Sequence, residues 1–334
     1  MKTIFVDAPI DPARIQRLDM PVTFAPSTDD DRPVVRPREL ICNAQFALCS
    51  YLPINLADMK QLELVQLSSS GYSQLFDLDL PSRGIRACNA RGVFDTAIAE
   101  WNMTMMVCLA RNLPQMMRNQ EMCVWDRAAV FQAEIRGSTV GLWGYGGIAR
   151  ETARLCKALG LTVHVLTRSG VSPRMHNYCV PNSGDPQGVL PDRVYGLEQR
   201  YEFLSGLDFL ILCTPLTPET EGMVGTAELQ ALPRQAFLLN PARGPLVQEE
   251  ALVQALREGW LAGAALDTHY QYPLPPGHPL WGLKNVILTP HISGSSESPF
   301  FRQRVWDLFT QNMERHLSNR ELLNELTPAQ LSGQ

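Results

Sequence analysis

The chain has 334 residues, of which 45% are hydrophobic and 19% charged, and its formal net charge is -5. This length allows two domains with substantial cores, and the composition is typical of a soluble globular protein. The negative charge argues against a nucleic-acid or anionic-membrane partner, and no apolar run is long enough to span a bilayer.

The N-terminal segment reads as a first strand rather than a signal peptide, because Asp7 ends a short apolar run. The eight cysteines are scattered, with no CxxC pair and no adjacent histidine. We therefore expect reduced thiols, a cytoplasmic location and no metal site.

The first hundred residues alternate short apolar runs with polar, proline-rich connections. This pattern predicts strands and helices in alternation, and hence an α/β domain with a mainly parallel sheet. The expected strands are 2–7, 46–50, 62–69 and 84–89, and the expected helices are 11–18 and 56–62.

A long helical segment follows at residues 94–120. It has Asp95 near its start and Arg118 near its end, which suits the helix dipole. The segment is apolar on more than one face, so we expect it to lie buried between domains, with a break or kink at Pro114.

From residue 138 the alternation resumes and predicts six strands, the number in a doubly wound nucleotide-binding sheet. These strands are 138–144, 161–167, 207–213, 236–240, 261–267 and 285–289. The segment 170–200 is rich in Pro, Gly and Asn and longer than a usual connection, so it is either a surface excursion or a functional flap. The last forty residues look helical, and we expect them to return to the first domain.

A glycine turn, "GLWGYGGIAR", joins the first two of these strands through a helix. Its spacing is Gly144-x-Gly146-x-x-Ala149: one glycine for a tight turn, one for close approach of a pyrophosphate, and a small residue for packing of helix against strand. The helix start supplies unbonded N–H groups for phosphate. Because a strand precedes the turn and another follows the helix, the context favours dinucleotide binding.

The second strand ends in Thr167, Arg168 and Ser169, where NAD-binding proteins usually place an acidic residue against the ribose 2′-hydroxyl. A guanidinium and two hydroxyls can instead bind a 2′-phosphate. We therefore predict a preference for NADP(H), with NAD(H) as the alternative.

At this point the chain resembles the D-isomer-specific 2-hydroxyacid dehydrogenase family, through several ordered motifs. These are the stretches 68–80, 96–113, 213–225, 238–256 and 263–294. The resemblance implies two doubly wound parallel-sheet α/β domains with a cleft between them. A flavodoxin-like substrate domain would take residues 1–102 plus 292–334, and a Rossmann-type dinucleotide domain 103–291. It also implies a homodimer built on the nucleotide domain.

The resemblance implies a role for individual residues as well. Arg243 resembles the arginine that binds the carboxylate and keto oxygen of the substrate, and His291 in "TPHISG" resembles the acid/base. Backbone N–H groups near Ser70 and Gly71 would bind the substrate carboxylate, and Tyr51, Leu52 and Tyr72 would shape side-chain specificity. The expected cofactor-binding residues are Gly144, Tyr145, Gly146, Gly147, Ile148, Thr167, Arg168, Ser169, Thr214, Pro215, Thr220, Pro241, Ala242, Asp267, His291 and Gly294, with Asp267 orienting the carboxamide.

One position departs from the family pattern. Where the family places a glutamate that pairs with the histidine, this chain has Tyr272 in "YQYPLP". A carboxylate there would raise the histidine pKa, and a tyrosine supplies no charge at neutral pH. The enzyme could work with a less basic His291 and an acid-shifted optimum, use Tyr272 to reshape the site for an unusual acid, or have lost activity.

The main hypothesis is an NAD(P)H-dependent reductase of a small 2-keto acid of the glyoxylate or hydroxypyruvate type. One alternative is a protein of the same fold that binds the cofactor without turnover, which Tyr272 favours and the retained Arg243 and His291 oppose. Another is a dehydrogenase of formate or phosphite, which also suits a cleft with an arginine and a histidine.

Overall fold

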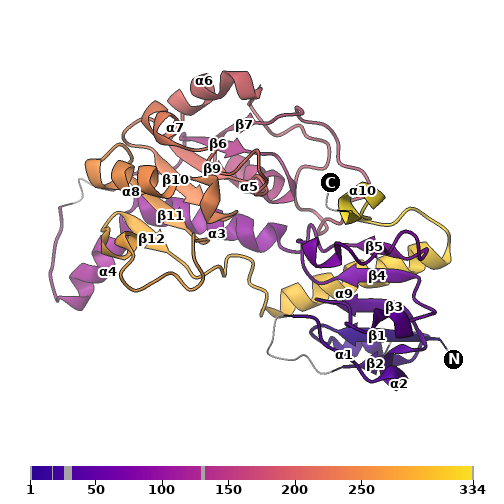
Figure 1. Ribbon diagram of the computed structural model, residues 1–334. Coiled ribbons are helices and arrows are strands. Elements are labelled where there is room, and N and C mark those ends of the chain that lie inside the picture. Colours follow the sequence, from indigo (N-terminus) through magenta and orange to yellow (C-terminus); the bar gives the residue numbers. More distant parts are fainter. Residues whose placement is uncertain (1, 17, 26–31, 129–131, 333–334) are drawn as a thin grey trace. The chain divides into compact units, whose positions relative to one another are not determined.

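Two parallel sheets organise the chain, one of five strands and one of seven (Figure 1). The computed structural model describes residues 2–16, 18–25, 32–128 and 132–332. It divides into unit 1, formed by Met1–Phe94, Met175–Val180 and Ser296–Gln334, and unit 2, formed by Asp95–Arg174 and Pro181–Ser295. The assignment of a substrate domain to 1–102 plus 292–334 and of a dinucleotide domain to 103–291 stays a prediction.

The sheet of unit 1 has the strand order β2-β1-β3-β4-β5, with every neighbouring pair parallel. This is the flavodoxin-like order. Its strands are β1 (Thr3–Asp7), β2 (Val22–Phe24), β3 (Ala44–Cys49), β4 (Leu64–Leu67) and β5 (Arg86–Cys88).

The helices of unit 1 are α1 (Pro12–Ile15), α2 (Arg38–Ile41), α9 (Pro299–Leu317) and α10 (Pro328–Leu331). The long helix α9 packs Trp306 and Phe309 against Ile4 and Phe46 of the sheet in one apolar cluster. A second cluster, which includes Phe5 and Val65, lies on alternate strand residues and so on the other face.

The sheet of unit 2 has the order β12-β11-β10-β9-β6-β7-β8 and is also fully parallel. Counted within the unit, this is the Rossmann order 3-2-1-4-5-6 with a seventh strand added. The strands are β6 (Thr139–Trp143), β7 (Thr162–Leu166), β8 (Arg193–Tyr195), β9 (Phe209–Leu212), β10 (Phe237–Asn240), β11 (Gly263–Leu266) and β12 (Val286–Leu288).

Helices cover both faces of this sheet, as a doubly wound fold requires. One apolar cluster joins the strands to α3 (Asp95–Ala110) and α5 (Gly147–Ala158). The other joins them to α6 (Arg200–Ser205), α7 (Thr226–Ala231) and α8 (Glu249–Glu258). The predicted fold class, two doubly wound parallel-sheet α/β domains, is therefore confirmed.

Several local predictions need correction. The nucleotide-binding sheet has seven strands instead of six, because β8 was missed within 170–200, and β2 was missed in unit 1. Residues 56–62 contain only a 3-10 turn, Leu56–Asp58, in place of a helix. The long helix divides into α3 and α4 (Leu113–Glu121), with Asn112 at φ 46° between them and Pro114 in the first turn of α4, so the predicted break is confirmed.

Residues 2–16, 18–25, 32–128 and 132–332 contain neither a membrane-spanning helix nor a metal-binding cluster. No helix in these ranges has the length and apolar character needed to cross a membrane. No three His, Cys, Asp or Glu side chains in the same ranges gather as a metal site would require.

Candidate active site

The glycine turn after β6 has the geometry that a dinucleotide pyrophosphate needs. Gly144 has φ 98°, and a Cβ there would lie 2.9 Å from the Cys213 carbonyl oxygen and from Thr214 Cγ2. Gly146 caps α5, and nothing lies within 4 Å of the Cβ position at this residue. The first amides of α5 have no acceptor within the helix, and the open position at Gly146 suits an anion. The Asp95 carboxylate lies against Gly147, where a Cβ would overlap it, and this negative charge would oppose an anion at that residue. Ala149 is fully buried against the sheet.

The Tyr145 side chain, in contrast, turns into the protein. Its hydroxyl donates to Asp185 Oδ2 at 2.7 Å, and the Arg150 guanidinium lies 4.9 Å from the ring centre. Burial, reinforced by the hydrogen bond to Asp185, raises the pKa of Tyr145. A ligand at the glycine turn could therefore use the backbone of Tyr145 but not its hydroxyl.

The end of β7 exposes Arg168 and Ser169, with Thr167 half-buried beside them. Glu219 lies near enough to interact with Arg168. The pKa of Glu219 is lowered chiefly by the hydrogen bond from the Thr217 hydroxyl, and slightly by Arg168. The sequence pattern gave no sign of this carboxylate, which would oppose a 2′-phosphate at Arg168.

The loop after β9 carries Thr214, Pro215 and Thr220. The Thr220 hydroxyl donates to the Pro215 carbonyl oxygen at 2.7 Å and accepts from the Thr217 amide at 2.8 Å. The Thr220 side chain thus closes the turn. Thr214 lies next to Gly144, since a Cβ at Gly144 would be 2.9 Å from Thr214 Cγ2.

Arg243 lies in a turn that the buried Asn240 organises at the end of β10. Asn240 Oδ1 accepts from the Ala242 and Arg243 amides at 3.1 and 3.2 Å, and Nδ2 donates to the Arg243 carbonyl oxygen at 2.8 Å. The Arg243 side chain is exposed and donates one bond, to the Ala242 carbonyl oxygen. The turn therefore fixes the backbone and leaves most of the guanidinium available for an acid.

His291 lies in a turn that the buried Asp267 holds. Asp267 accepts from the Thr289 hydroxyl at 2.6 Å and from the Ile292 and Ser293 amides at 2.9 and 3.0 Å. The Asp267 carbonyl oxygen also accepts from the His291 amide at 2.7 Å. These bonds hold His291 at φ 58°, a conformation that few non-glycine residues adopt. The predicted role of Asp267 in orienting a carboxamide stays a prediction.

Arg243 and His291 form one electrostatic site at the carboxyl edge of the unit 2 sheet. Partial desolvation of the ring, the Arg243 guanidinium and His269 lower the pKa of His291, and Asp267 acts in the opposite direction. Within the described part of the chain, no carboxylate forms a hydrogen bond or ion pair with the His291 ring.

Tyr272 occupies the position beside His291 without bonding to it. The two ring centres lie 5.5 Å apart, and the Tyr272 hydroxyl accepts from the His269 amide at 3.2 Å. His269 is buried, with Nε2 2.8 Å from the Thr289 carbonyl oxygen. Sequence reasoning missed Asn240 and His269, although an Asn at the end of a strand and before Pro241 is a recognisable turn signal.

The predicted substrate-binding residues Tyr51, Ser70 and Gly71 belong to unit 1. The Ser70 carbonyl oxygen accepts from Asn89 Nδ2 at 2.9 Å, and nothing lies within 4 Å of a Cβ at Gly71. The substrate-binding loop, residues 68–71, thus follows β4 and has open space at Gly71. Its approach to Arg243 and His291 stays a prediction.

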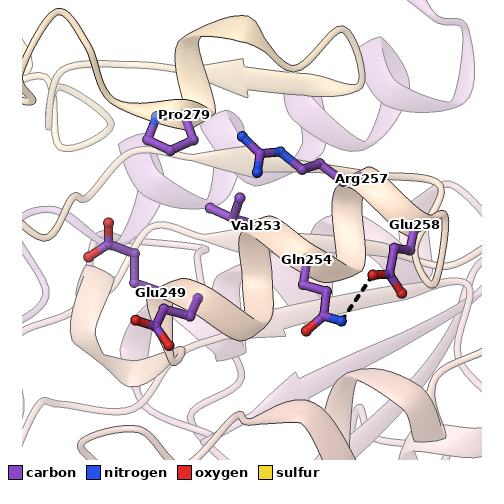
Figure 2. A pocket seen from close by; sticks show the side chains of 7 residues that line it. Glu249, Val253, Gln254, Arg257, Glu258 and Pro279 are labelled. Carbon is purple, nitrogen blue, oxygen red and sulfur yellow. Dashed lines mark hydrogen bonds between the residues drawn. The ribbon is translucent and has the colours of Figure 1, made fainter.

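A separate hollow on α8, shown in Figure 2, contains none of the predicted site residues. It is lined by Glu249, Glu250, Val253, Gln254, Arg257, Glu258 and Pro279. Three carboxylates would repel an anionic keto acid, so this hollow is not the candidate active site.

Comparisons with known proteins agree with this geometry. Residues 103–293 match the sequence model described as D-isomer specific 2-hydroxyacid dehydrogenase, NAD binding domain. The chain is 32% identical over 252 residues to a glyoxylate reductase from Thermofilum pendens, covering 73% of this chain and 70% of that protein. It is 27% identical over 332 residues to a glycerate dehydrogenase from Methylorubrum extorquens, covering 96% and 97%.

A solved structure is similar over nearly the whole length. The NADPH-dependent glyoxylate/hydroxypyruvate reductase from Sinorhizobium meliloti, in complex with NADP and malonate, matches with a TM-score of 0.68 and 27% identity. The match covers 98% of this chain and 97% of that one. Since the family model spans more than half of the chain, the protein belongs to the D-isomer specific 2-hydroxyacid dehydrogenase family and is an NAD(P)-dependent oxidoreductase, as the sequence predicted.

Proposed function

We propose that this enzyme reduces a small 2-keto acid of the glyoxylate or hydroxypyruvate type to the D-2-hydroxy acid. The observation that carries the proposal is the exposed Arg243 guanidinium in one electrostatic site with His291. The names of the relatives from Thermofilum pendens and Sinorhizobium meliloti support the choice of acid.

The roles of the two side chains follow from their chemistry. Arg243 binds the substrate carboxylate and keto oxygen, because its planar fork can donate to both. His291, when protonated, donates a proton to the keto oxygen as negative charge develops there. The N–H groups at Ser70 and Gly71 add donors to the carboxylate. The bound reduced nicotinamide supplies the hydride.

A panel of 2-keto acids with NADPH and with NADH, followed at the nicotinamide absorbance band, tests this function. Glyoxylate or hydroxypyruvate should give the highest kcat/KM. Binding of dinucleotide without turnover of any keto acid would favour a protein that binds the cofactor without catalysis. Turnover of formate or phosphite would favour a formate or phosphite dehydrogenase.

We also propose that NADP(H) is the preferred cofactor, with Arg168 binding the 2′-phosphate and Thr167 and Ser169 assisting. Arg168→Ala should weaken NADPH binding by roughly tenfold or more, since a charge-assisted hydrogen bond contributes about 1.5–3 kcal/mol. NADH binding should hardly change.

Glu219→Gln should strengthen NADPH binding, because it removes the carboxylate near Arg168. Arg234→Ala, at an exposed position, is the control. A wild type that binds NADH as tightly as NADPH would contradict this choice.

A homodimer built on unit 2 is proposed as well. Large apolar side chains are exposed along α4 and the residues after it, with Trp125 89% exposed. They are Leu113, Met117, Met122, Val124 and Trp125. An exposed patch of this kind marks an association surface. Light scattering should show a dimer for the wild type and a monomer for the Met122→Ser/Trp125→Ser double variant, and a monomeric wild type would refute the proposal.

A further inference from the structure

The connection between β7 and β8 departs from unit 2 and returns to it. We call residues 170–192 the strap. Its two ends belong to unit 2, and its middle, Met175–Val180, belongs to unit 1. The chain therefore passes from one unit to the other and back within this single segment.

The unit 2 ends of the strap are fixed at the glycine turn. Arg150, in the first turn of α5, donates to the Ser172 carbonyl oxygen at 2.6 Å and to the Asp185 carbonyl oxygen. The Asp185 carboxylate accepts from the Tyr145 hydroxyl at 2.7 Å. Arg174 lies so close to Gly147 that a Cβ there would be 2.9 Å from its Nη1.

The middle of the strap is built into unit 1. Tyr178 is 5% exposed and packs in the apolar cluster that contains Val93 and Trp306. Gly92, at φ 92°, leaves room for it, since a Cβ at this residue would overlap the Tyr178 carbonyl oxygen. Contact this close requires glycine and shows that the strap is packed against the turn after β5.

Asn324 joins the strap to the turn after β5 through the oxygen and the nitrogen of its side-chain amide. Oδ1 accepts from the Tyr178 amide at 3.1 Å, and Nδ2 donates to the Asn89 and Arg91 carbonyl oxygens at 3.2 and 2.7 Å. The Asn324 backbone amide also donates to the His176 carbonyl oxygen at 2.9 Å. The side chain is buried, and its bonds to the Tyr178 amide and the Asn89 carbonyl oxygen are shielded from water.

The same turn holds the substrate-binding loop. Asn89 Nδ2 donates to the Ser70 carbonyl oxygen at 2.9 Å, and the Ala90 amide donates to the Ser69 carbonyl oxygen at 2.8 Å. Hydrogen bonds therefore run from the strap through Asn324 and Asn89 to Ser70.

We propose that Asn324 is a positioning residue for the substrate-binding loop, and that the strap couples this loop to the dinucleotide turn. The identity of residues 68–71 as the loop that binds the acid rests on the proposed function. We expect NADPH binding at the glycine turn to strengthen binding of the keto acid, and because coupling is reciprocal, the keto acid should strengthen NADPH binding by the same factor.

Asn324→Gly tests the positioning role, because glycine accepts the φ of 57° and removes only the side-chain bonds. The KM for glyoxylate should rise roughly tenfold, since a buried network loses its bonds. The Kd for NADPH should stay within about twofold, because the glycine turn is unchanged. The matched control is Glu321→Ala, which removes only the exposed His176–Glu321 pair on the strap. Unchanged KM in a folded Asn324→Gly would overturn the proposal.

Hydrogen exchange supplies a readout that does not depend on turnover. In the wild type, NADPH should slow amide exchange at residues 144–150 and at 68–74, whereas in Asn324→Gly only the first effect should persist. Asn324→Asp keeps the acceptor for the Tyr178 amide and loses the donors to the Asn89 and Arg91 carbonyl oxygens, so it should also lose the protection at 68–74. This variant replaces Asn324→Gly if the glycine variant does not fold.

Equal protection of 68–74 in wild type and variants would overturn the coupling. A wild type that shows both protections and reduces no keto acid would support the coupling and contradict the proposed function.

Discussion

The turns that carry Arg243 and His291 differ from the substrate-binding loop in what holds them. In unit 2, Asn240 bonds to amides two and three residues ahead of it, and Asp267 bonds to residues 289–293, which follow the adjacent strand β12. In unit 1, loop 68–71 has local bonds, such as that from the Ser68 amide to the Cys49 carbonyl oxygen. It is also bonded by Asn89, which in turn is bonded by Asn324, 235 residues away in sequence. The catalytic turns are thus fixed at their own sheet edge, whereas the loop is in addition bonded, through Asn89 and Asn324, to the C-terminal segment and the strap.

The residues that hold the backbone of the site also differ in exposure from the residues proposed to contact the substrate. Asn240, Asp267 and Asn324 are all buried, whereas Arg243 and His291 are exposed. A buried amide or carboxylate is costly unless its bonds are made, so it holds one backbone geometry strongly. Variants of the exposed residues should therefore lose catalytic rate directly, whereas variants of the buried residues should act by disturbing the backbone that those residues hold.

The largest effect is expected at Arg243. Arg243→Ala should lower kcat/KM for glyoxylate by roughly a thousandfold or more, because it removes the cation that binds the acid and stabilises the developing charge. NADPH binding should be unchanged, since the glycine turn lies elsewhere. Arg243→Lys should recover only part of the rate, because it keeps the charge and loses the fork. Near-normal turnover by Arg243→Ala would show that the reaction does not require this residue.

Asp267→Asn should have the next largest effect, roughly ten- to a hundredfold in kcat/KM at pH 7. It weakens the bonds that hold the His291 turn, and it removes the charge that raises the pKa of His291. The pH profile should shift to lower pH. Asp208→Asn is the matched control, since Asp208 accepts from the Thr139 amide at the other end of the sheet. It should lower stability and leave the pH profile in place.

A small effect is expected from Tyr272→Phe. The hydroxyl accepts from the His269 amide and does not reach His291, so its loss should change kcat/KM by no more than about threefold. Tyr272→Glu should raise the pKa of His291, because it places a carboxylate beside the ring. A large loss in Tyr272→Phe would show that the hydroxyl orients His291 during the reaction.

Much of the fold could be predicted from the sequence, because central parallel strands are nearly continuous apolar runs. The missed strands β2 and β8 are edge strands of three residues each, and in β8 only Tyr195 is buried. Short edge strands carry too little apolar periodicity to be recognised. The helix break was predictable because Pro114 cannot lie inside a continuous helix.

The site was predictable where a motif fixes it locally, as at Gly144 and Gly146. Asn324 could not be found in this way, since its role depends on chain segments that only the fold brings together. The inward orientation of the Tyr145 side chain could not be predicted either, because its partner Asp185 lies 40 residues further on, in the strap.

The central claim is that His291 acts as the acid without a paired carboxylate. The most direct test is the pH dependence of kcat/KM for glyoxylate reduction with saturating NADPH in the wild type. Reduction needs protonated His291, and partial desolvation, Arg243 and His269 lower its pKa. The account predicts that kcat/KM falls about tenfold per pH unit above a midpoint below about 6.5. A profile that stays flat to above about pH 8 would contradict it, because another group would then hold the proton on His291.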